Sequence, residues 1–551
     1  MYSFKSIKLY FFSILKLFFL KIKNFYFKTR FYNKKLISHI PDRIYYNPST
    51  YLSASLITMN NDFYNIKDIS PEKLWEKSIK NKLEFDNLHS FLWLAKLDRK
   101  KTKQITKKIV SSWIENFFNY NPSTWKMDII AKRIIAWSSN TDLTLENSDN
   151  AYKDKFFLSF IKQSNFLMRN FNSLQNEIDK ITCCAAIILS GIMFGEEYIN
   201  YKTGTKELER IIKNFFDENG FPKSRNPEEV FICLKYLILI REWLKEAQIS
   251  VPDFLNDIII KCGNCYKFLS CDNKQFPLFN GATEINHKDY DIFLKNLKYK
   301  FINKNNEISN FIKIKKKKFE FFMDCGNPPP NSYIKNYQAG CLSFELISNK
   351  QKIICNTGYG KYFPSKLSFL SRSTAAHSTL YINNTSSCVF QKNKFINKIY
   401  GNSLIEKHRV IKKNYTEDNN FFSIIASHNG YEKRFGYIHT RSMKISKKED
   451  KIFGNDELKK TKNYSKPLNY FIRFHIYPET KIVKTKAGNS ILISLSNGEG
   501  WLLQCKTNNL TIEKNIFLGN KNKIINNESV SISGSINNEI ISINWEIEKV
   551  S

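Results

Sequence analysis

Apolar residues along the chain follow two different periodicities, and the change between them lies near residue 310. From about residue 70 to residue 300, they recur every three or four positions, which is the spacing of one buried helix face. Short polar breaks that contain Gly, Pro and Asn separate these segments. The pattern predicts an array of antiparallel helix pairs, with helices at residues 105–118, 127–137, 154–170, 180–194, 207–216, 228–246 and 252–269.

Beyond residue 310 the chain consists of short segments rich in β-branched and aromatic residues, separated by Asn, Gly, Lys and Ser. Segments of this composition and length are typical of strands. Because no helical segments alternate with them, they favour an antiparallel sandwich over strand-helix-strand units. The predicted strands include residues 319–323, 341–347, 352–355, 422–426, 470–476, 490–495, 500–505 and 540–547.

The first 30 residues differ from both regions. Lys16, Lys21 and Lys23 interrupt their apolar run and no small-residue cleavage site follows, so neither a membrane-spanning helix nor a cleaved signal peptide fits. On a helix, residues Lys5, Lys8, Lys16 and Lys23 would share one narrow face opposite a broad apolar one. Two interpretations stay open: a helix lying on an anionic membrane, or an amphipathic helix packed on its own domain.

A chain of 551 residues can hold two large domains. We predict a basic amphipathic segment over residues 1–30, a helical domain over 31–310 and a β-sandwich domain over 311–551. The polar, lysine-rich passage over residues 301–318 marks the boundary, as an exposed linker or edge strand.

The composition excludes wholesale disorder, because 42% of the residues are hydrophobic and 15% are aromatic. A formal net charge of +34 allows two explanations. Either codon composition has enriched lysine, or a basic surface meets a polyanion. No nucleic-acid motif is present, so no nucleic-acid partner is expected. The eleven cysteines suggest no disulfide framework, and Cys262 and Cys265 lie in a helical pattern. Neither a metal site nor a cofactor is predicted.

The densest motifs lie between Asp324 and Cys388. Asp324-Cys-Gly-Asn-Pro-Pro-Pro330 leads into Ala339-Gly-Cys-Leu-Ser-Phe-Glu-Leu346, and Arg372-Ser-Thr-Ala-Ala-His-Ser-Thr-Leu-Tyr-Ile382 follows. Correctly spaced after a helical first half, these phrases resemble the C-terminal domain of the heparinase II/III family of polysaccharide lyases. The stretch from Asn219 to Pro227 and Leu278-Phe-Asn-Gly281 look like the corresponding parts of bacterial members.

The resemblance implies an incomplete (α/α) toroid of helical hairpins followed by an antiparallel β-sandwich, with a cleft for an acidic polysaccharide. Such enzymes cleave the bond at C4 of a uronic acid by β-elimination. The sugar carboxylate must be neutralised, a base must take the C5 proton, and an acid must protonate the leaving oxygen. In the family these roles usually fall to an Asn or His, and to a Tyr and a His.

The sequence departs from this pattern at two positions. Gln338 stands where the family has a His, and Glu229 falls on or beside the position of the expected Tyr. An amide cannot act as a base near neutral pH, although it can orient a substrate by hydrogen bonding. Glu229 could act as a base if burial raised its pKa. Tyr337, next to Gln338, could compensate if it faces the cleft.

The resemblance and the residue types together give two groups of candidates. For three of them a structural role stays open: a histidine bonded to backbone for His377, an ion pair for Arg372 and a helix cap for Asn226. The candidate catalytic residues are Tyr337, His377 and Asn226, and the candidate substrate-binding residues are Arg225, Arg372, Gln338, Glu229 and His475.

The resulting hypothesis is a protein that cleaves an acidic glycan by β-elimination. The alternative is a catalytically weak or inactive glycan-binding protein of the cell envelope on the same scaffold. Under either hypothesis, the expected partners of the protein are an acidic polysaccharide and an anionic membrane surface reached through residues 1–30. Its expected location is the cell envelope or periplasm, or alternatively the cytoplasm or the periphery of the inner membrane, because no cleavable signal is evident.

Overall fold

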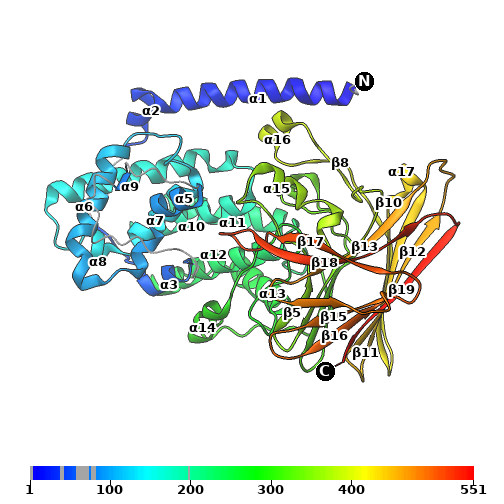
Figure 1. The fold of residues 1–551 in the computed structure, drawn as a ribbon. Helices are drawn as coiled ribbons and strands as arrows, with labels where there is room; N and C mark the ends of the chain where they lie inside the picture. Colours follow the sequence, from blue (N-terminus) through cyan, green and yellow to red (C-terminus); the bar gives the residue numbers. More distant parts are fainter. Residues whose placement is uncertain (1–3, 38–42, 58–73, 76–81, 196–198, 551) are drawn as a thin grey trace. The chain divides into compact units, whose positions relative to one another are not determined.

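The computed structural model describes residues 4–37, 43–57, 74–75, 82–195 and 199–550. Contacts divide the chain into two compact units, of which unit 1 comprises Met1–Phe216 and Phe231–Cys262 and unit 2 comprises Asp217–Val230 and Gly263–Ser551. Helices make up the described part of unit 1, and antiparallel strands dominate unit 2 (Figure 1). The predicted fold class, helices followed by an antiparallel sandwich, is therefore confirmed. The residue boundaries of the three predicted domains stay a prediction.

Each of the seven predicted helices is present. Several begin earlier than the apolar pattern, because polar caps set their first residues: Asp98 caps α6 and Asp149 caps α9 through their carboxylates. The longer helices are α1 (Phe4–Lys28), α5 (Lys82–Ser90), α6 (Arg99–Phe117), α7 (Met127–Ser138), α9 (Asn150–Asn170), α10 (Glu177–Met193), α11 (Ile199–Phe215), α12 (Pro227–Glu246) and α13 (Asp253–Leu269). The short ones are α2 (Arg30–Lys35), α3 (Thr50–Ala54) and α8 (Thr141–Thr144).

The core of unit 1 is aromatic and surrounds α7. The ring of Phe91 meets Trp137 edge to face at 5.5 Å, and Trp137 meets Trp113 in the same way at 5.5 Å. The guanidinium of Arg133 lies 4.0 Å from the Trp113 ring and donates to Gln163 at 2.7 Å. Buried aromatic pairs of this kind add to the free energy of folding beyond the area that they bury. A charged residue is tolerated here because its N–H groups find acceptors.

Unit 2 contains two large antiparallel sheets within its described residues. One has the strand order β1-β2-β3-β4-β5-β13-β18-β17, with β6 also paired to β13, and the other has the order β14-β15-β16-β19-β12-β11-β10-β9. The first sheet is formed by β1 (Glu307–Ile308), β2 (Phe311–Lys315), β3 (Phe319–Asp324), β4 (Phe344–Ser348), β5 (Gln351–Cys355), β6 (Leu380–Ile382), β13 (Asn469–Ile476), β17 (Leu510–Phe517) and β18 (Ile525–Ser535). The second is formed by β9 (Val410–Glu417), β10 (Phe421–Tyr431), β11 (Tyr437–Ser446), β12 (Lys451–Lys460), β14 (Lys481–Lys484), β15 (Ser490–Ser494), β16 (Gly500–Gln504) and β19 (Ile540–Lys549).

The two sheets enclose one hydrophobic core. Phe344 of β4 stacks on Trp545 of β19 with ring centroids 5.7 Å apart, so side chains of the two sheets meet face to face. Phe474 of β13 also contacts Trp545, at 4.9 Å. Inner-face burial on both sheets is the arrangement of a sandwich. The connections carry β7 (Val389–Phe390), β8 (Leu404–Glu406), α14 (Lys288–Asn296), α15 (Ser365–Leu370), α16 (Lys394–Tyr400) and α17 (Glu432–Phe435).

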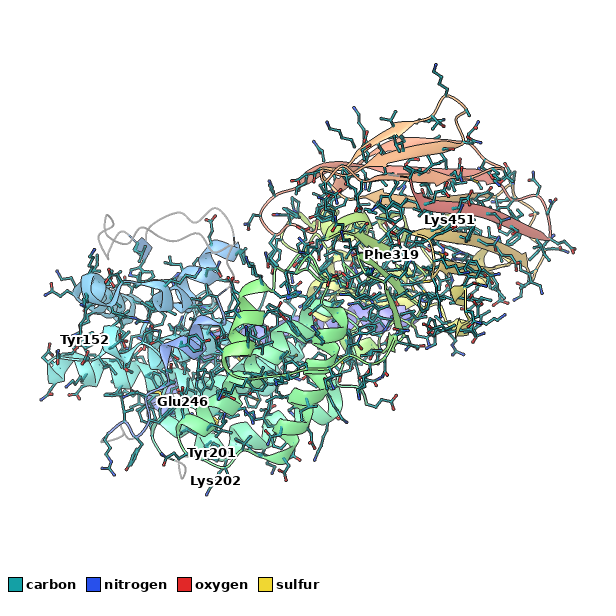
Figure 2. All side chains as sticks on the ribbon, turned by 90° about the horizontal axis from the view of Figure 1, so that it is seen from below. Tyr152, Tyr201, Lys202, Glu246, Phe319 and Lys451 are labelled. Atoms are coloured by element: carbon teal, nitrogen blue, oxygen red, sulfur yellow. The ribbon has the colours of Figure 1, made fainter. Side chains whose placement is uncertain are left out.

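The predicted N-terminal helix is present as α1, a long helix at the blue end of the chain in Figure 1. Its C-terminal end is anchored in unit 1: Phe27 is buried against Phe166 at 5.2 Å, and Tyr120 donates to Asn24 at 2.7 Å. From Tyr10 to Tyr26 most of its large apolar side chains are exposed. Figure 2 draws the described side chains as sticks and labels Phe319 of β3 and Lys451 of β12 in unit 2. Among the described residues, no helix combines the length and the apolar character needed to cross a bilayer.

Candidate functional site

All eight candidate residues lie in unit 2, and three of them lie in or just after the turn that precedes α12. The side-chain oxygen of Asn226 accepts the Glu228 N–H at 2.9 Å, which caps the helix just before Pro227 at its first position. Arg225 precedes it in the left-handed region, with φ of 59°. Asn226 therefore caps the turn, as one interpretation of the sequence proposed. Its catalytic role stays a prediction.

Arg225 is held by an acidic partner inside unit 2. Its Nη2 donates to Asp324 Oδ1 at 2.6 Å, and the other carboxylate oxygen of Asp324 accepts from Asn280 at 3.0 Å. Burial lowers the pKa of Arg225, but Asp324 raises it by more, so the pKa lies above its ordinary value. This pair compensates the arginine charge within the protein.

Two adjacent glutamates at the start of α12 have opposite pKa shifts. Burial raises the pKa of Glu228, but Lys361 and Lys521 lower it further, to about 2. Their Nζ atoms lie 3.2 and 3.0 Å from its oxygens, and Thr283 donates through both its N–H and its hydroxyl. Glu228 is therefore ionised throughout the physiological pH range.

Glu229, the next residue, has much less compensation. Burial raises its pKa to about 7, against smaller lowering effects of a hydrogen bond from Ser224, the charge of Lys361 and a hydrogen bond from Asn336. A carboxyl group with this pKa exists in both protonation states near neutral pH and can take up or release a proton. Pairs whose environments separate their pKa values in this way are typical of acid-base sites.

Gln338 is completely buried and its amide is engaged on both sides. Its Oε1 accepts the Gly281 N–H at 2.8 Å, and its Nε2 donates to the carbonyls of Gly358 at 3.1 Å and Ser371 at 2.6 Å. The side chain therefore joins three loops of unit 2. These contacts are structural, and substrate binding by Gln338 stays a prediction.

Tyr337 and Arg372 pack together beneath the surface. The Tyr337 ring lies in an apolar cluster with Ile334 and Phe390, and burial raises the pKa of its hydroxyl well above the ordinary value. Arg372 donates through Nε to the Tyr337 carbonyl at 2.8 Å and stacks on Phe390 at 4.4 Å. Burial lowers the pKa of Arg372 to about 10. Within the described chain, the Tyr337 hydroxyl and Arg372 Nη1 are buried without hydrogen-bond partners.

His377 lies against Gly340, where a Cβ atom would come within 2.4 Å of the imidazole ring. Its Nδ1 lies 2.8 Å from the Ser373 carbonyl, which can only accept, so Nδ1 carries the proton in the neutral ring. Burial lowers the pKa of His377 to about 4, which keeps the ring neutral. The lone pair of Nε2 is then buried without a partner among the described residues.

His475 supports the loop that carries His377. Its Nε2 lies 3.0 Å from the Ala375 carbonyl, and its Nδ1 lies 2.6 Å from the Asn515 amide. Its backbone N–H donates to the Ser378 hydroxyl at 3.0 Å. Because burial lowers its pKa well below the ordinary value, the ring is neutral and fixed. Both ring nitrogens are occupied by protein groups, and contact with substrate stays a prediction.

Three residues that the geometry adds were not among the sequence candidates: Glu228, Lys361 and Lys521. Two of them are lysines among many, and no local motif distinguishes them. The pair of glutamates at a helix start was the available signal, since acidic residues are favoured there. No group of three or more His, Cys, Asp or Glu side chains in the described ranges is arranged to hold a metal ion.

Comparison with known proteins identifies a matching family model and solved structures with the same fold. Residues 305–546 match the family model described as heparinase II/III-like, C-terminal. A crystal structure of heparinase III matches with a TM-score of 0.68, at 16% identity over 96% of this chain and 88% of that one. Heparan sulfate lyase HepC from Pedobacter heparinus matches with a TM-score of 0.59, at 14% identity over 94% and 87%. At these identities the structures show a shared fold, a helical toroid followed by a β-sandwich.

A curated relative carries a different kind of name. FtsZ-localized protein C of Caulobacter vibrioides (strain NA1000 / CB15N) is 21% identical over 442 residues, which cover 76% of this chain and 73% of that protein. The chain is thus similar both to polysaccharide lyases and to a protein named for its localisation.

Proposed function

Because residues 305–546 match the heparinase II/III-like C-terminal family model and the fold is shared with heparinase III, we propose that this chain acts on an acidic, uronate-containing polysaccharide by β-elimination. The observation that carries the proposal is the Glu229 carboxyl group, whose pKa is raised to about 7 by burial although the charge of Lys361 lowers it. A base with this pKa is matched to proton transfer at neutral pH. A nearby ammonium group is the complement that a uronate carboxylate requires.

In the proposed reaction, ionised Glu229 takes the C5 proton of the uronate. The electron pair of the C5–H bond forms the C4=C5 double bond, the C4–O bond breaks, and the protonated Glu229 returns its proton to the leaving oxygen. Lys361 pairs with the uronate carboxylate, which makes the C5 proton more acidic. Its side chain is about one quarter exposed, and Glu228 holds its pKa above the ordinary value, so it stays charged.

The test is turnover of a panel of uronic-acid polymers, followed by the ultraviolet absorbance of the unsaturated uronide. We expect activity in the native chain and a loss of about 100-fold or more in Glu229→Gln. Glu539→Gln, which changes an exposed carboxylate, is the matched control and keeps full activity. Absence of product from the folded native chain across the whole panel would contradict the proposal.

The locked amide of Gln338 favours a second candidate, a glycan-binding protein that keeps the scaffold without efficient elimination. The relative named FtsZ-localized protein C also supports a role in localisation. In that case the native chain binds acidic glycans but leaves them intact. Isothermal titration with a polyuronate, run beside the absorbance assay, separates binding with turnover from binding alone.

We also propose that α1 attaches the protein to the surface of an anionic membrane at the cell envelope. Residues 1–41 contain eight lysines and one arginine but no acidic residue. Phe11, Phe18 and Phe25 of α1 are each more than half exposed. Exposed aromatic residues beside lysines are typical of helices that lie in the interface of anionic lipid.

Flotation with vesicles of anionic and of zwitterionic lipid tests the attachment. The native chain should float with anionic vesicles, and changing Phe11, Phe18 and Phe25 together to Ser should abolish flotation. The matched control changes Tyr362, Tyr400 and Tyr464, exposed aromatics of unit 2, to Ser. Equal flotation of the native chain and the α1 variant would contradict membrane attachment.

A further inference from the structure

Two adjoining hollows on unit 2 are lined by lysines and share no residue with the candidate site. Their volumes are about 220 and 810 Å³, and Lys267, Lys274 and Asp291 border both. We call the two hollows together the lysine groove. The larger volume lies in the range of known ligand sites.

The groove is built on the last turns of α13 and the end of α14. Lys298, in the left-handed region with φ of 61°, ends α14, and the Tyr299 N–H returns to the Leu294 carbonyl at 2.9 Å. The next residues lie over α13, where a Cβ atom on Gly263 would come within 2.1 Å of the Phe301 ring. The segment from Lys298 to Phe301, which lines the larger hollow, is therefore tightly anchored.

The charge of the groove is mostly uncompensated. Lys267, Lys295, Lys298 and Lys300 are exposed, and no carboxylate of the described chain lies within ion-pair distance of them. The three other lysines of the groove have acidic partners: Lys274 pairs with Asp291 at 3.0 Å, Lys313 with Glu320 at 3.4 Å and Lys315 with Asp272 at 2.5 Å. The groove thus carries a local excess of positive charge, which attracts anions.

His287 is part of the wall of the smaller hollow. The residue is buried, and its Nδ1 lies 3.1 Å from the Tyr266 hydroxyl and 3.2 Å from Asp291. Its Nε2 is buried without a partner within the described residues. His287 thus holds the wall of the smaller hollow through its Nδ1 contacts.

We propose that the lysine groove is a second binding site for an acidic polysaccharide, which holds the polymer away from the candidate site. The unpaired lysines meet sugar carboxylates or sulfates, and the stacked rings of Tyr299 and Phe301, 5.8 Å apart, offer apolar surface for sugar rings. Asp272 and Asp291, each already paired with a lysine, can also accept hydrogen bonds from sugar hydroxyls. The inference rests on the proposed function, because the polymer belongs to the same class.

Affinity electrophoresis of the full chain in gels that contain alginate, neutral dextran or single-stranded DNA tests the groove. The test variant changes Lys267, Lys295, Lys298 and Lys300 to Gln, and its control changes Lys444, Lys466, Lys486 and Lys506, exposed lysines elsewhere in unit 2. We expect the test variant to lose about tenfold in alginate affinity at low salt, since each exposed ion pair contributes a small factor. The control and the dextran gels should show little change.

The outcomes separate this inference from the proposed function. If the native chain binds alginate and the test variant binds equally well, the groove is not the second site, and the proposed function is unaffected. If the native chain does not bind alginate, the inference about the groove is contradicted, and the turnover assay over the whole panel decides the proposed function separately. Stronger binding to DNA than to alginate, lost in the test variant, would assign the groove to a nucleic acid and overturn the inference.

Discussion

Two buried charge clusters of unit 2 differ in how completely they are paired. In the sandwich cluster of His439, Arg441, Asp456 and Trp545, the two Asp456 oxygens receive four contacts between 2.7 and 2.9 Å. In the helix-start cluster of Glu228, Glu229, Lys361 and Lys521, Glu228 binds both lysines, and Glu229 is left with a raised pKa. We call the first cluster closed, because every charge in it is paired, and a closed cluster contributes to structure. In the second cluster the pairing is incomplete, which leaves the Glu229 carboxyl group able to exchange protons.

The largest effect is expected when the closed cluster is broken. Asp456→Asn removes the charge that faces the fully buried Arg441, and an uncompensated buried charge costs about 3–5 kcal/mol in the free energy of unfolding. Urea denaturation followed by the β-sheet circular dichroism signal measures it. Glu539→Gln, an exposed substitution, should change stability by less than about 0.5 kcal/mol. A cost below about 1 kcal/mol for Asp456→Asn would show that the cluster is not closed in solution.

The two glutamates should affect stability with opposite dependence on pH. The folded pKa of Glu228, about 2, lies below its ordinary value of 4.5. Its contribution of up to about 3 kcal/mol is therefore present above pH 4.5 and lost as the pH falls toward 2. The folded pKa of Glu229, about 7, lies above 4.5, so ionisation destabilises the fold by up to about 3 kcal/mol as the pH rises from 4.5 to 7.

Isosteric variants measure the two contributions. Glu229→Gln should be more stable than the native chain at pH 8 and similar to it near pH 4.5. Glu228→Gln should be less stable than the native chain at pH 7, and the difference should shrink toward pH 2. Urea midpoints across this range provide the measurement. If the stability difference from the native chain changed with pH in the same way for both variants, the two glutamates would not have opposite pKa shifts.

Restoring the residue types that the family has would test Gln338 directly. A histidine cannot reproduce an amide that accepts from Gly281 while donating to Gly358 and Ser371, so Gln338→His should cost about 1–3 kcal/mol in the free energy of unfolding. Combined with Glu229→Tyr, it should create turnover if the native chain only binds glycans. If Glu229 is the base, the double variant should instead lose the native activity.

The helical and strand regions were predictable because each buries one face with a clear period. The seven helices and the two-sheet architecture follow from that pattern, as α7 and β4 illustrate. The first residues of the helices were predicted less accurately, because capping residues such as Asp149 lie outside the apolar stripe. The pairing of Phe344 with Trp545 could not be foreseen, since it joins residues 201 positions apart in the sequence.

Residues of the candidate site could be predicted only where they belong to a recognisable sequence motif. Sequence pointed to Glu229 and to the condition that burial raise its pKa, and the contacts around α12 meet that condition. The sequence could not reveal that the side chains of Gln338 and Arg372 donate hydrogen bonds to backbone carbonyls, because those partners depend on loop geometry. Nor could it find Lys361, whose role arises from its position next to Glu228 in the fold.

The smallest expected effect concerns Asn226, for which helix capping and catalysis can be separated. Asn226→Ala should cost about 1 kcal/mol in the free energy of unfolding, because the Glu228 N–H loses its acceptor. Asn226→Asp keeps an acceptor at the helix start but places a negative charge where a uronate would approach. If Asn226 helps to neutralise the uronate, the Asp variant should be as stable as the native chain yet turn over acidic glycan far more slowly. Equal turnover by the native chain and the Asp variant would leave Asn226 with its capping role alone.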